Sequence, residues 1–400
     1  MLDSTGTEND TAGRLSAILG VSVPETHQQM YVEAKKFADE VLIPAADRHD
    51  REESFPESQV SALAEKGYLG ILAPKKFGGM GLDNLALTLA LEEINRGCAS
   101  TGVTLSVHNS LLSSPLLHFG TEEQQERFFP GLASGKSLGA YAITEPDHGS
   151  DALSIETTCR KEGDEWILNG TKAWITNGSR AGTIITFATM DPALRSKGIN
   201  AFVVDPTMPG YTVGKKELKL GIRGSDTVQL VFDEMRVPAE NLLGEEGHGF
   251  KIAMHTLDGG RVGIATQAVG IAQACLDTAV EFAEGHEMFG RRLADNKLVS
   301  HKIADMATRI EASRLLTLRA AMLKDAGAPH SRQASMAKLS ASEIANDAAR
   351  MALEIHGGAG IGRQSPIERL FRDAKICEIY EGTSQIQRLV IARHVRPDRS

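Results

Sequence analysis

The chain has 400 residues, of which 42% are hydrophobic and 24% charged, a composition that excludes a disordered or fibrous protein. Its formal net charge of −9 argues against a general nucleic-acid-binding protein, because such proteins neutralise phosphates with an excess of Lys and Arg. No apolar run approaches the roughly 18 residues needed to cross a membrane, and the length allows two or three domains.

The four cysteines are spread along the sequence and form no CxxC pair or cluster of metal ligands. They are Cys98, Cys159, Cys275 and Cys377. We therefore predict buried free thiols in a reducing compartment and no metal site. The N-terminal segment resembles neither a secretory signal nor an Arg-rich transit peptide. It fits a cytoplasmic bacterial protein or a processed form in the mitochondrial matrix, and the sequence leaves both open.

The predicted elements divide the chain into four segments. Residues 1–25 are expected to be a loose tail, and residues 26–138 show apolar spacings of three and four, which predict a helical domain. Short β-rich runs such as AYAIT, KAWITNG and TVQLVFD fill residues 139–245, separated by turn signals. Residues 246–400 return to a helical pattern, which predicts a C-terminal helical bundle.

Two segments of the predicted β domain suit a polar, planar ligand. In YAITEPDHGSD, residues 141–151, the hydroxyls of Thr144 and Ser150 and exposed backbone N–H groups could donate hydrogen bonds; taken alone, the segment is an ordinary turn. In LNGTKAWITNG, Trp174 and Thr176 alternate along a strand and could face a ring system. Taken alone, a Trp on a strand usually belongs to the core.

Two segments of the predicted bundle suggest phosphate contacts and acid–base chemistry. HGGAGIG, residues 356–362, lets the backbone approach a phosphate, although a helix end explains it equally well. In IYEGTSQIQRL, Glu381 precedes Gly382 just before a helix. Burial would raise the pKa of this carboxylate and make it a useful base. The alternative is an acid that complements the helix dipole.

These segments, with KLGIRGSDT, TLDGGRVGIA and FGRRL, occur in an order that resembles the acyl-CoA dehydrogenase family from about Pro24 to about His394. The likeness is strongest to its short-chain, butyryl-CoA branch. The resemblance implies an α+β fold with an N-terminal helical domain, a middle β-barrel-like domain and a C-terminal helical bundle. It also implies an FAD cofactor, part of which a neighbouring subunit holds, and a homotetramer.

The resemblance assigns roles to individual residues. Glu381 is implied to be the catalytic base, and Gly260 stands where some relatives carry theirs. The implied cofactor-binding residues are Tyr141, Ala142, Ile143, Thr144, Ser150, Trp174, Ile175, Thr176, His286, Lys297, Glu354, Ile355, His356, Gly357, Gly358, Thr383, Ser384 and Gln385. The implied substrate-binding residues are Ser150, Asp258, Gly259, Gly260, Arg261 and Gly382.

Three of the cofactor positions depart from the family pattern. His286 replaces a usual Arg, and Lys297 and Glu354 each replace a usual Gln. Arg to His weakens a permanent phosphate contact, and Glu354 adds an acid near an anionic cofactor. We expect Lys297 to pair with Glu354 and compensate for it; the alternative is weakened FAD binding.

The implied reaction is α,β-dehydrogenation of a short-chain acyl-CoA to trans-2-enoyl-CoA in fatty acid β-oxidation, with electrons passed to an electron-transferring flavoprotein. Two alternatives stay open. One is a short branched-chain or biosynthetic acyl-thioester dehydrogenase, whose pocket shape the sequence does not define. The other is a non-enzymatic acyl-CoA-binding relative with impaired FAD binding.

Overall fold

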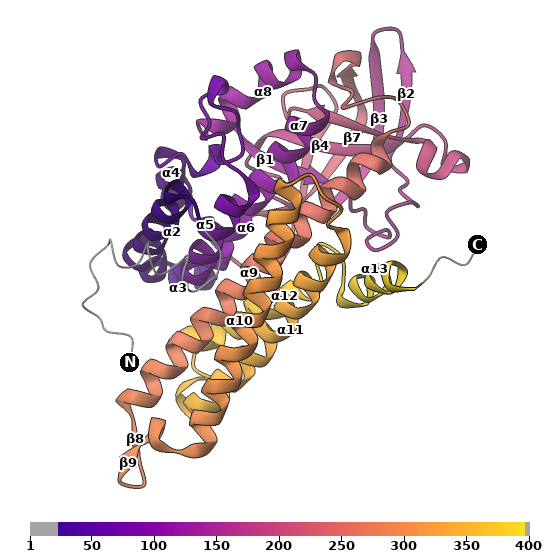
Figure 1. Ribbon diagram of the computed structural model, residues 1–400. Coiled ribbons are helices and arrows are strands. Elements are labelled where there is room, and N and C mark those ends of the chain that lie inside the picture. The colour runs from indigo at the N-terminus through magenta and orange to yellow at the C-terminus, as the bar shows by residue number, and fades with distance from the viewer. Residues whose placement is uncertain (1–22, 397–400) are drawn as a thin grey trace.

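The computed structural model describes residues 23–396, and it shows helices, then a curled sheet, then a second set of helices (Figure 1). The predicted α+β order of elements is therefore confirmed. Residues 1–22 of the expected tail lie outside the described residues. Among residues 23–396, no helix is long and apolar enough to cross a membrane.

The N-terminal part consists of short helices around one long buried helix. They are α2 (Glu25–Phe37), η1 (Ala38–Leu42), α3 (Ile43–Glu52), α4 (Glu57–Glu65), η2 (Tyr68–Gly70), η3 (Lys75–Phe77), α5 (Asn84–Gly97), α6 (Ala99–Ser106), η4 (Val107–Ser113), α7 (Ser114–Phe119) and α8 (Glu122–Ala133). Asp83 caps α5 by accepting a hydrogen bond from the N–H of Ala86, and Thr121 and Gln124 form a capping box at α8. The π-helical segment η4 packs against α9 and strand β1 and so lies at the centre of the molecule.

The middle part is a seven-stranded sheet. Its strands are β1 (Leu138–Ala142), β2 (Thr158–Glu162), β3 (Glu165–Thr176), β4 (Ala181–Thr189), β5 (Ile199–Val204), β6 (Tyr211–Lys216) and β7 (Thr227–Pro238). The order is β1-β4-β2-β3-β7-β6, with β5 also paired to β4. Strand β1 runs parallel to β4, whereas β3 and β7 pair antiparallel along most of their length. Trp166 and Phe202 meet edge to face in the core of this sheet.

The C-terminal part is a bundle of long helices that extends away from the sheet (Figure 1). It comprises α9 (Gly249–Gly285), β8 (Glu287–Met288), β9 (Arg291–Arg292), η7 (Leu293–Asp295), α10 (Lys297–Asp325), α11 (Ser331–His356), η8 (Gly357–Ala359), α12 (Pro366–Cys377) and α13 (Ser384–Val395). Helix α9 packs against α5, α10 and α11. Its buried Ala265, Ala268 and Ala272 allow the close helix packing that the Ala-rich sequence predicts. The prediction of free buried cysteines is also confirmed for all four.

Candidate active site

Glu381 lies in the turn between α12 and α13, where the backbone is left-handed at two consecutive residues. Glu381 has φ +52° and Gly382 has φ +89°. Gly tolerates this conformation, but for Glu it costs about 1–2 kcal/mol. Thr383 then caps α13 by accepting a hydrogen bond from the N–H of Ile386 at 3.3 Å. The turn therefore needs other contacts to hold Glu381 in place.

The carboxyl group of Glu381 points at helix α9. A Cβ atom at Gly260 would lie 2.5 Å from its Oε2 atom and 2.8 Å from Cδ2 of Leu111, so only glycine leaves room. Oε2 is buried and has no hydrogen-bond partner. Burial raises the pKa of Glu381 to about 7, against the opposing charges of Arg261 and Lys338. A carboxyl with this pKa can accept a proton near neutral pH.

Arg261 and Asp258 form a buried ion pair one turn apart on α9. The guanidinium Nη1 donates to Oδ1 of Asp258 at 2.5 Å. The hydroxyl of Ser331 donates to the same Asp258 oxygen at 2.9 Å. Nε of Arg261 is buried without a hydrogen-bond partner, so one donor beside Glu381 remains free for a polar ligand.

Tyr141 faces the same region from the end of β1. Its ring packs edge-on against Phe187 with a centroid distance of 5.2 Å. Its hydroxyl is buried without a partner, and burial, with the negative charge of Glu381, raises its pKa. Four residues from three parts of the chain thus meet here: Tyr141 from β1, Gly260 and Arg261 from α9, and Glu381 from the α12–α13 turn.

The side chains of Trp174 and Thr176 remain accessible on strand β3. Trp174 is 55% exposed, whereas Trp166 on the same strand is 2% exposed and fills the core. The pairing of β3 with β7 shifts register between Lys172 and Ile175, and Trp174 there has φ +60°. The core interpretation of a strand Trp is therefore wrong for Trp174 and correct for Trp166.

The other predicted residues of the sheet differ in what they can offer a ligand. Thr144 and Ile143 are half-buried and Ser150 is exposed, so these side chains are accessible. The carbonyl of Thr144 accepts a hydrogen bond from the N–H of Ala173 at 2.9 Å, which places the Thr144 loop beside Trp174. Ala142 and Ile175 are buried in the sheet core, so only their backbone atoms can face a ligand.

A buried ion pair that the sequence analysis missed fastens this loop to the strand. Nζ of Lys172 donates to Oε1 of Glu145 at 2.7 Å, with side-chain exposures of 0% and 3%. Glu145 also accepts hydrogen bonds from the backbone N–H groups of Glu156 and Thr157, at 2.5 and 3.0 Å. In a regular strand, side chains alternate between faces, so Lys172 and Trp174 of KAWIT would lie on the same face. The register shift between Lys172 and Ile175 instead leaves Lys172 buried and Trp174 exposed.

A second group of predicted cofactor residues lies at the far end of the bundle (Figure 1). His286 stacks on Phe282 at 3.7 Å, and Phe282 stacks on His356 at 4.2 Å. Gly357 and Gly358 end α11 beside them and are exposed. From Arg261 to the end of α9 is 24 residues, or about 36 Å. One chain therefore does not bring the two groups together.

The expected pairing of Lys297 with Glu354 is wrong within one chain. Glu354 instead accepts hydrogen bonds from Lys302 at 2.5 Å and from Arg350 at 2.7 Å, and these cations lower its pKa. Lys297 begins α10 five residues before Lys302. Five residues turn an α-helix by about 140°, which directs Lys297 to another side of the helix.

The remaining predicted residues flank Glu381 in sequence. Ser384 is buried and its hydroxyl has no partner, whereas Gln385 is exposed on the first turn of α13.

A narrow cavity of about 10 Å³ lies between α5, η4 and α9. Its lining includes Thr88, Ser110, Gly259 and Gly263, so it begins one residue from Gly260.

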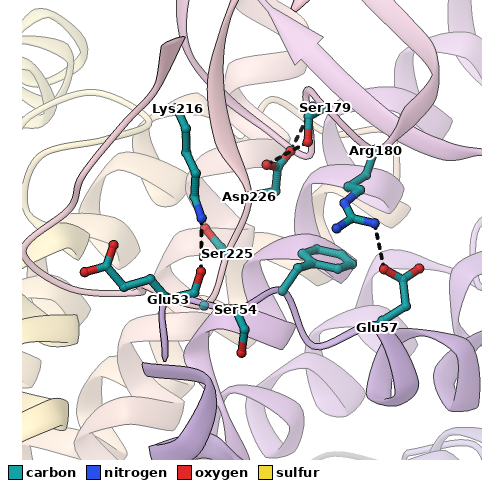
Figure 2. A pocket seen from close by; sticks show the side chains of 10 residues that line it. Glu53, Ser54, Glu57, Ser179, Arg180, Lys216, Ser225 and Asp226 are labelled. Carbon is teal, nitrogen blue, oxygen red and sulfur yellow. Dashed lines mark hydrogen bonds and ion pairs between the residues drawn. The ribbon is translucent and has the colours of Figure 1, made fainter. Parts of the chain in front are cut away.

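A larger cavity of about 440 Å³ lies elsewhere, between the α3–α4 connection and the sheet (Figure 2). Its charged side chains are already partnered. Arg180 pairs with Glu57 at 2.8 Å, and Asp226 accepts two hydrogen bonds from Ser179. Nζ of Lys216 donates to the carbonyl of Glu53. None of the predicted site residues lines this cavity.

Gly260→Ala tests the packing of Glu381 against α9. Alanine is the better helix former by about 1 kcal/mol, but its Cβ would lie 2.5 Å from Oε2 and displace the carboxylate. We expect any reaction that uses the Glu381 carboxylate as its base to slow about 10- to 100-fold, because small misplacements of a reacting group are costly. Gly285→Ala, whose Cβ would meet nothing within 4 Å, is the control. Equal activity of the two variants would contradict this geometry.

The comparisons with known proteins agree along the whole described chain. Three family models match: acyl-CoA dehydrogenase, N-terminal domain, at residues 24–136, middle domain at 140–235 and C-terminal domain at 247–396. The mitochondrial short-chain specific acyl-CoA dehydrogenase of Rattus norvegicus is 52% identical over 94% of this chain and 91% of its own.

Two solved structures are also similar. A chain in a structure described as the electron transferring flavoprotein of Acidaminococcus fermentans has a TM-score of 0.93 and 44% identity, over 94% of this chain and 99% of that one. Butyryl-CoA dehydrogenase from Megasphaera elsdenii has a TM-score of 0.91 and 41% identity, over the same shares. The chain therefore belongs to the acyl-CoA dehydrogenase family of FAD-dependent flavoprotein oxidoreductases.

Proposed function

We propose that this protein oxidises a short-chain acyl-CoA thioester to the trans-2-enoyl-CoA, with Glu381 as the base that takes the α-proton. The observation that carries this proposal is the Glu381 carboxyl, whose Oε2 is buried and unpartnered against Gly260 and whose pKa burial raises to about 7. The α-proton passes to Oε2. When bound, FAD supplies the acceptor for the hydride that leaves the β-carbon.

The residues present fit an FAD. Trp174 is exposed and has a left-handed backbone conformation, and strained residues of this kind cluster at ligand-binding sites. Tyr141, Ala142, Ile143, Thr144, Trp174, Ile175 and Thr176 would hold the ring system in this chain, and Thr383, Ser384 and Gln385 would border it. The other predicted cofactor residues lie at the far end of the bundle, about 36 Å along α9 from Arg261. They are His286, Lys297, Glu354, Ile355, His356, Gly357 and Gly358. We therefore assign them to the FAD of a neighbouring subunit, in a homotetramer.

The thioester would lie between α9 and the Glu381 turn. Asp258, Gly259, Gly260, Arg261 and Gly382 border this space, and Ser150 lies on the accessible loop of the sheet. The free Nε of Arg261 offers a donor to a polar part of the substrate. The cavity beyond Gly259 has a volume of only about 10 Å³, so the side chains that line it leave no room there for a long acyl chain.

Electrons would then pass to an electron-transferring flavoprotein. The exposed Trp174 ring supports this part of the proposal, because it lies on the accessible side of the sheet. The similarity to a chain described with the electron transferring flavoprotein of Acidaminococcus fermentans also supports it. The unpartnered Glu381 argues against the non-enzymatic alternative, since burying a carboxyl without a role costs free energy.

The absorption spectrum of the purified protein, before and after addition of butyryl-CoA, tests the proposal. We expect a bound flavin that bleaches with butyryl-CoA. We also expect the highest kcat/KM with butyryl-CoA and a clear loss with octanoyl-CoA. Each methylene that the pocket cannot house costs about 1–3 kcal/mol. Isobutyryl-CoA tests the branched-chain alternative. A preference for octanoyl-CoA would contradict the short-chain assignment, and a protein that binds no FAD would contradict the reaction.

A further inference from the structure

Lys338 is a buried lysine beside the catalytic turn that nothing in the proposed reaction uses. Its side chain lies on α11 with an exposure of 0%. Its Nζ donates a hydrogen bond to the carbonyl of Gly382 at 2.7 Å. Within residues 23–396, no carboxylate lies within 4.0 Å of this Nζ. Burying an ammonium group without a paired anion is costly, so its position calls for a reason.

Gln387 makes the matching contacts from the other side of the turn. Its Nε2 donates to the carbonyl of Glu381 at 3.1 Å and to that of Gly382 at 2.9 Å. The Gly382 carbonyl thus accepts hydrogen bonds from buried side chains of both α11 and α13. The Glu381 carbonyl accepts one from α13 alone. These bonds fix the peptide between Glu381 and Gly382 and offset the cost of its conformation.

Lys338 is also one of two cations whose charge favours the ionised Glu381 carboxyl, the other and stronger being Arg261. The charged or titratable groups that face the Glu381 carboxyl are Arg261 from α9, Lys338 from α11, Tyr141 from β1 and the neighbouring Tyr380. Those that face the Lys338 ammonium are Glu381, Arg261, and Cys377 and Glu378 from the end of α12. Arg261 is paired with Asp258 and Glu378 with Lys375, whereas Lys338 has no ion-pair partner among residues 23–396. Burial lowers the pKa of Lys338 to about 8, which still leaves it protonated at pH 7.

We propose that Lys338 is a positioning residue that holds the Glu381–Gly382 turn through the Gly382 carbonyl and whose positive charge favours the carboxylate form of Glu381. Gln387 is its uncharged counterpart, which holds the same turn without affecting the charge. The inference rests on the proposed role of Glu381 as the base.

Three variants separate the charge from the hydrogen bond. Lys338→Gln removes the charge and keeps a donor, Lys338→Met removes both, and Gln387→Met removes a donor without a charge change. A positive charge favours the carboxylate, so its loss raises the pKa of Glu381. In single-turnover flavin reduction by butyryl-CoA, we expect Lys338→Gln to move the acid limb of the pH profile up by about 1 pH unit.

Lys338→Met should show the same shift and a plateau rate about tenfold lower, since the turn also loses a restraint. Gln387→Met should lower the plateau and leave the limb in place. A merely structural role would lower the rate without moving the limb in any variant. If Lys338→Met does not fold, Lys338→Gln and Gln387→Met still make the comparison.

The infrared carbonyl band of protonated Glu381, identified by its loss in Glu381→Gln, provides a readout without turnover. We expect this band to titrate about 1 pH unit higher in Lys338→Gln than in the wild type and in Gln387→Met. An unchanged midpoint would overturn the inference. The proposed reaction fails on a different observation, a wild-type flavin that acyl-CoA does not reduce, so the two failures are distinguishable.

Discussion

Glu381→Gln is expected to slow flavin reduction by butyryl-CoA about 10²- to 10⁴-fold, the usual contribution of a positioned base. An amide has nearly the shape of the carboxyl but cannot accept the α-proton. The carboxyl Oε2 has no hydrogen-bond partner in the protein, so the substitution breaks no contact of the folded chain. FAD content and thermal stability should therefore remain those of the wild type, and stability should rise slightly if the buried charge is costly.

The measurement is stopped-flow bleaching of the flavin by butyryl-CoA without an external electron acceptor. Glu378→Gln is the control, because it removes the same charge three residues earlier from a carboxylate that is already paired with Lys375 at 2.5 Å. The control should bleach at nearly the wild-type rate. Bleaching of Glu381→Gln at the wild-type rate would remove Glu381 from the mechanism and leave the family assignment unchanged.

Part of this arrangement follows from a local motif and the local backbone acting together. Glu381 and Gly382 stand together in the sequence, and the turn between α12 and α13 places the Glu381 carboxyl against Gly260 of α9. The order of helices, sheet and helices also follows from periodicity, because apolar spacing changes when the chain enters the sheet. Glycine at 260 is explained only by the structure, where its missing Cβ makes room for the carboxylate.

The sequence fails where the outcome depends on a partner that is distant along the chain. Lys338 lies 44 residues from Gly382 and Lys172 lies 27 from Glu145, so no spacing rule connects them. Trp174 illustrates a second limit, because a register shift between β3 and β7 decides which side it faces. Glu354 illustrates a third: the rotation of α10 selects Lys302 rather than Lys297 as its partner.

Lys172→Met is expected to destabilise the flavin side of the sheet by about 3–5 kcal/mol, the usual cost of removing one partner of a buried ion pair. Glu145 would remain 3% exposed with its two backbone N–H donors but without a counter-charge. The loop between Glu145 and Thr157, which carries Ser150, would then open more often. Amide hydrogen exchange at Glu156 and Thr157 should become roughly 10²- to 10⁴-fold faster, since about 1.4 kcal/mol corresponds to tenfold.

Arg236→Met provides the contrast, because Arg236 of β7 pairs with Glu165 of β3 at 2.8 Å on the same sheet, but the two side chains are 52% and 40% exposed. An exposed pair contributes about 0–1 kcal/mol, so exchange at the same amides should change less than about fivefold. Adding Glu145→Gln to Lys172→Met should restore much of the protection, because it removes the unpaired charge that the single variant leaves buried. If Lys172→Met and Arg236→Met had equal effects, the buried pair would not be what fastens this loop to β3.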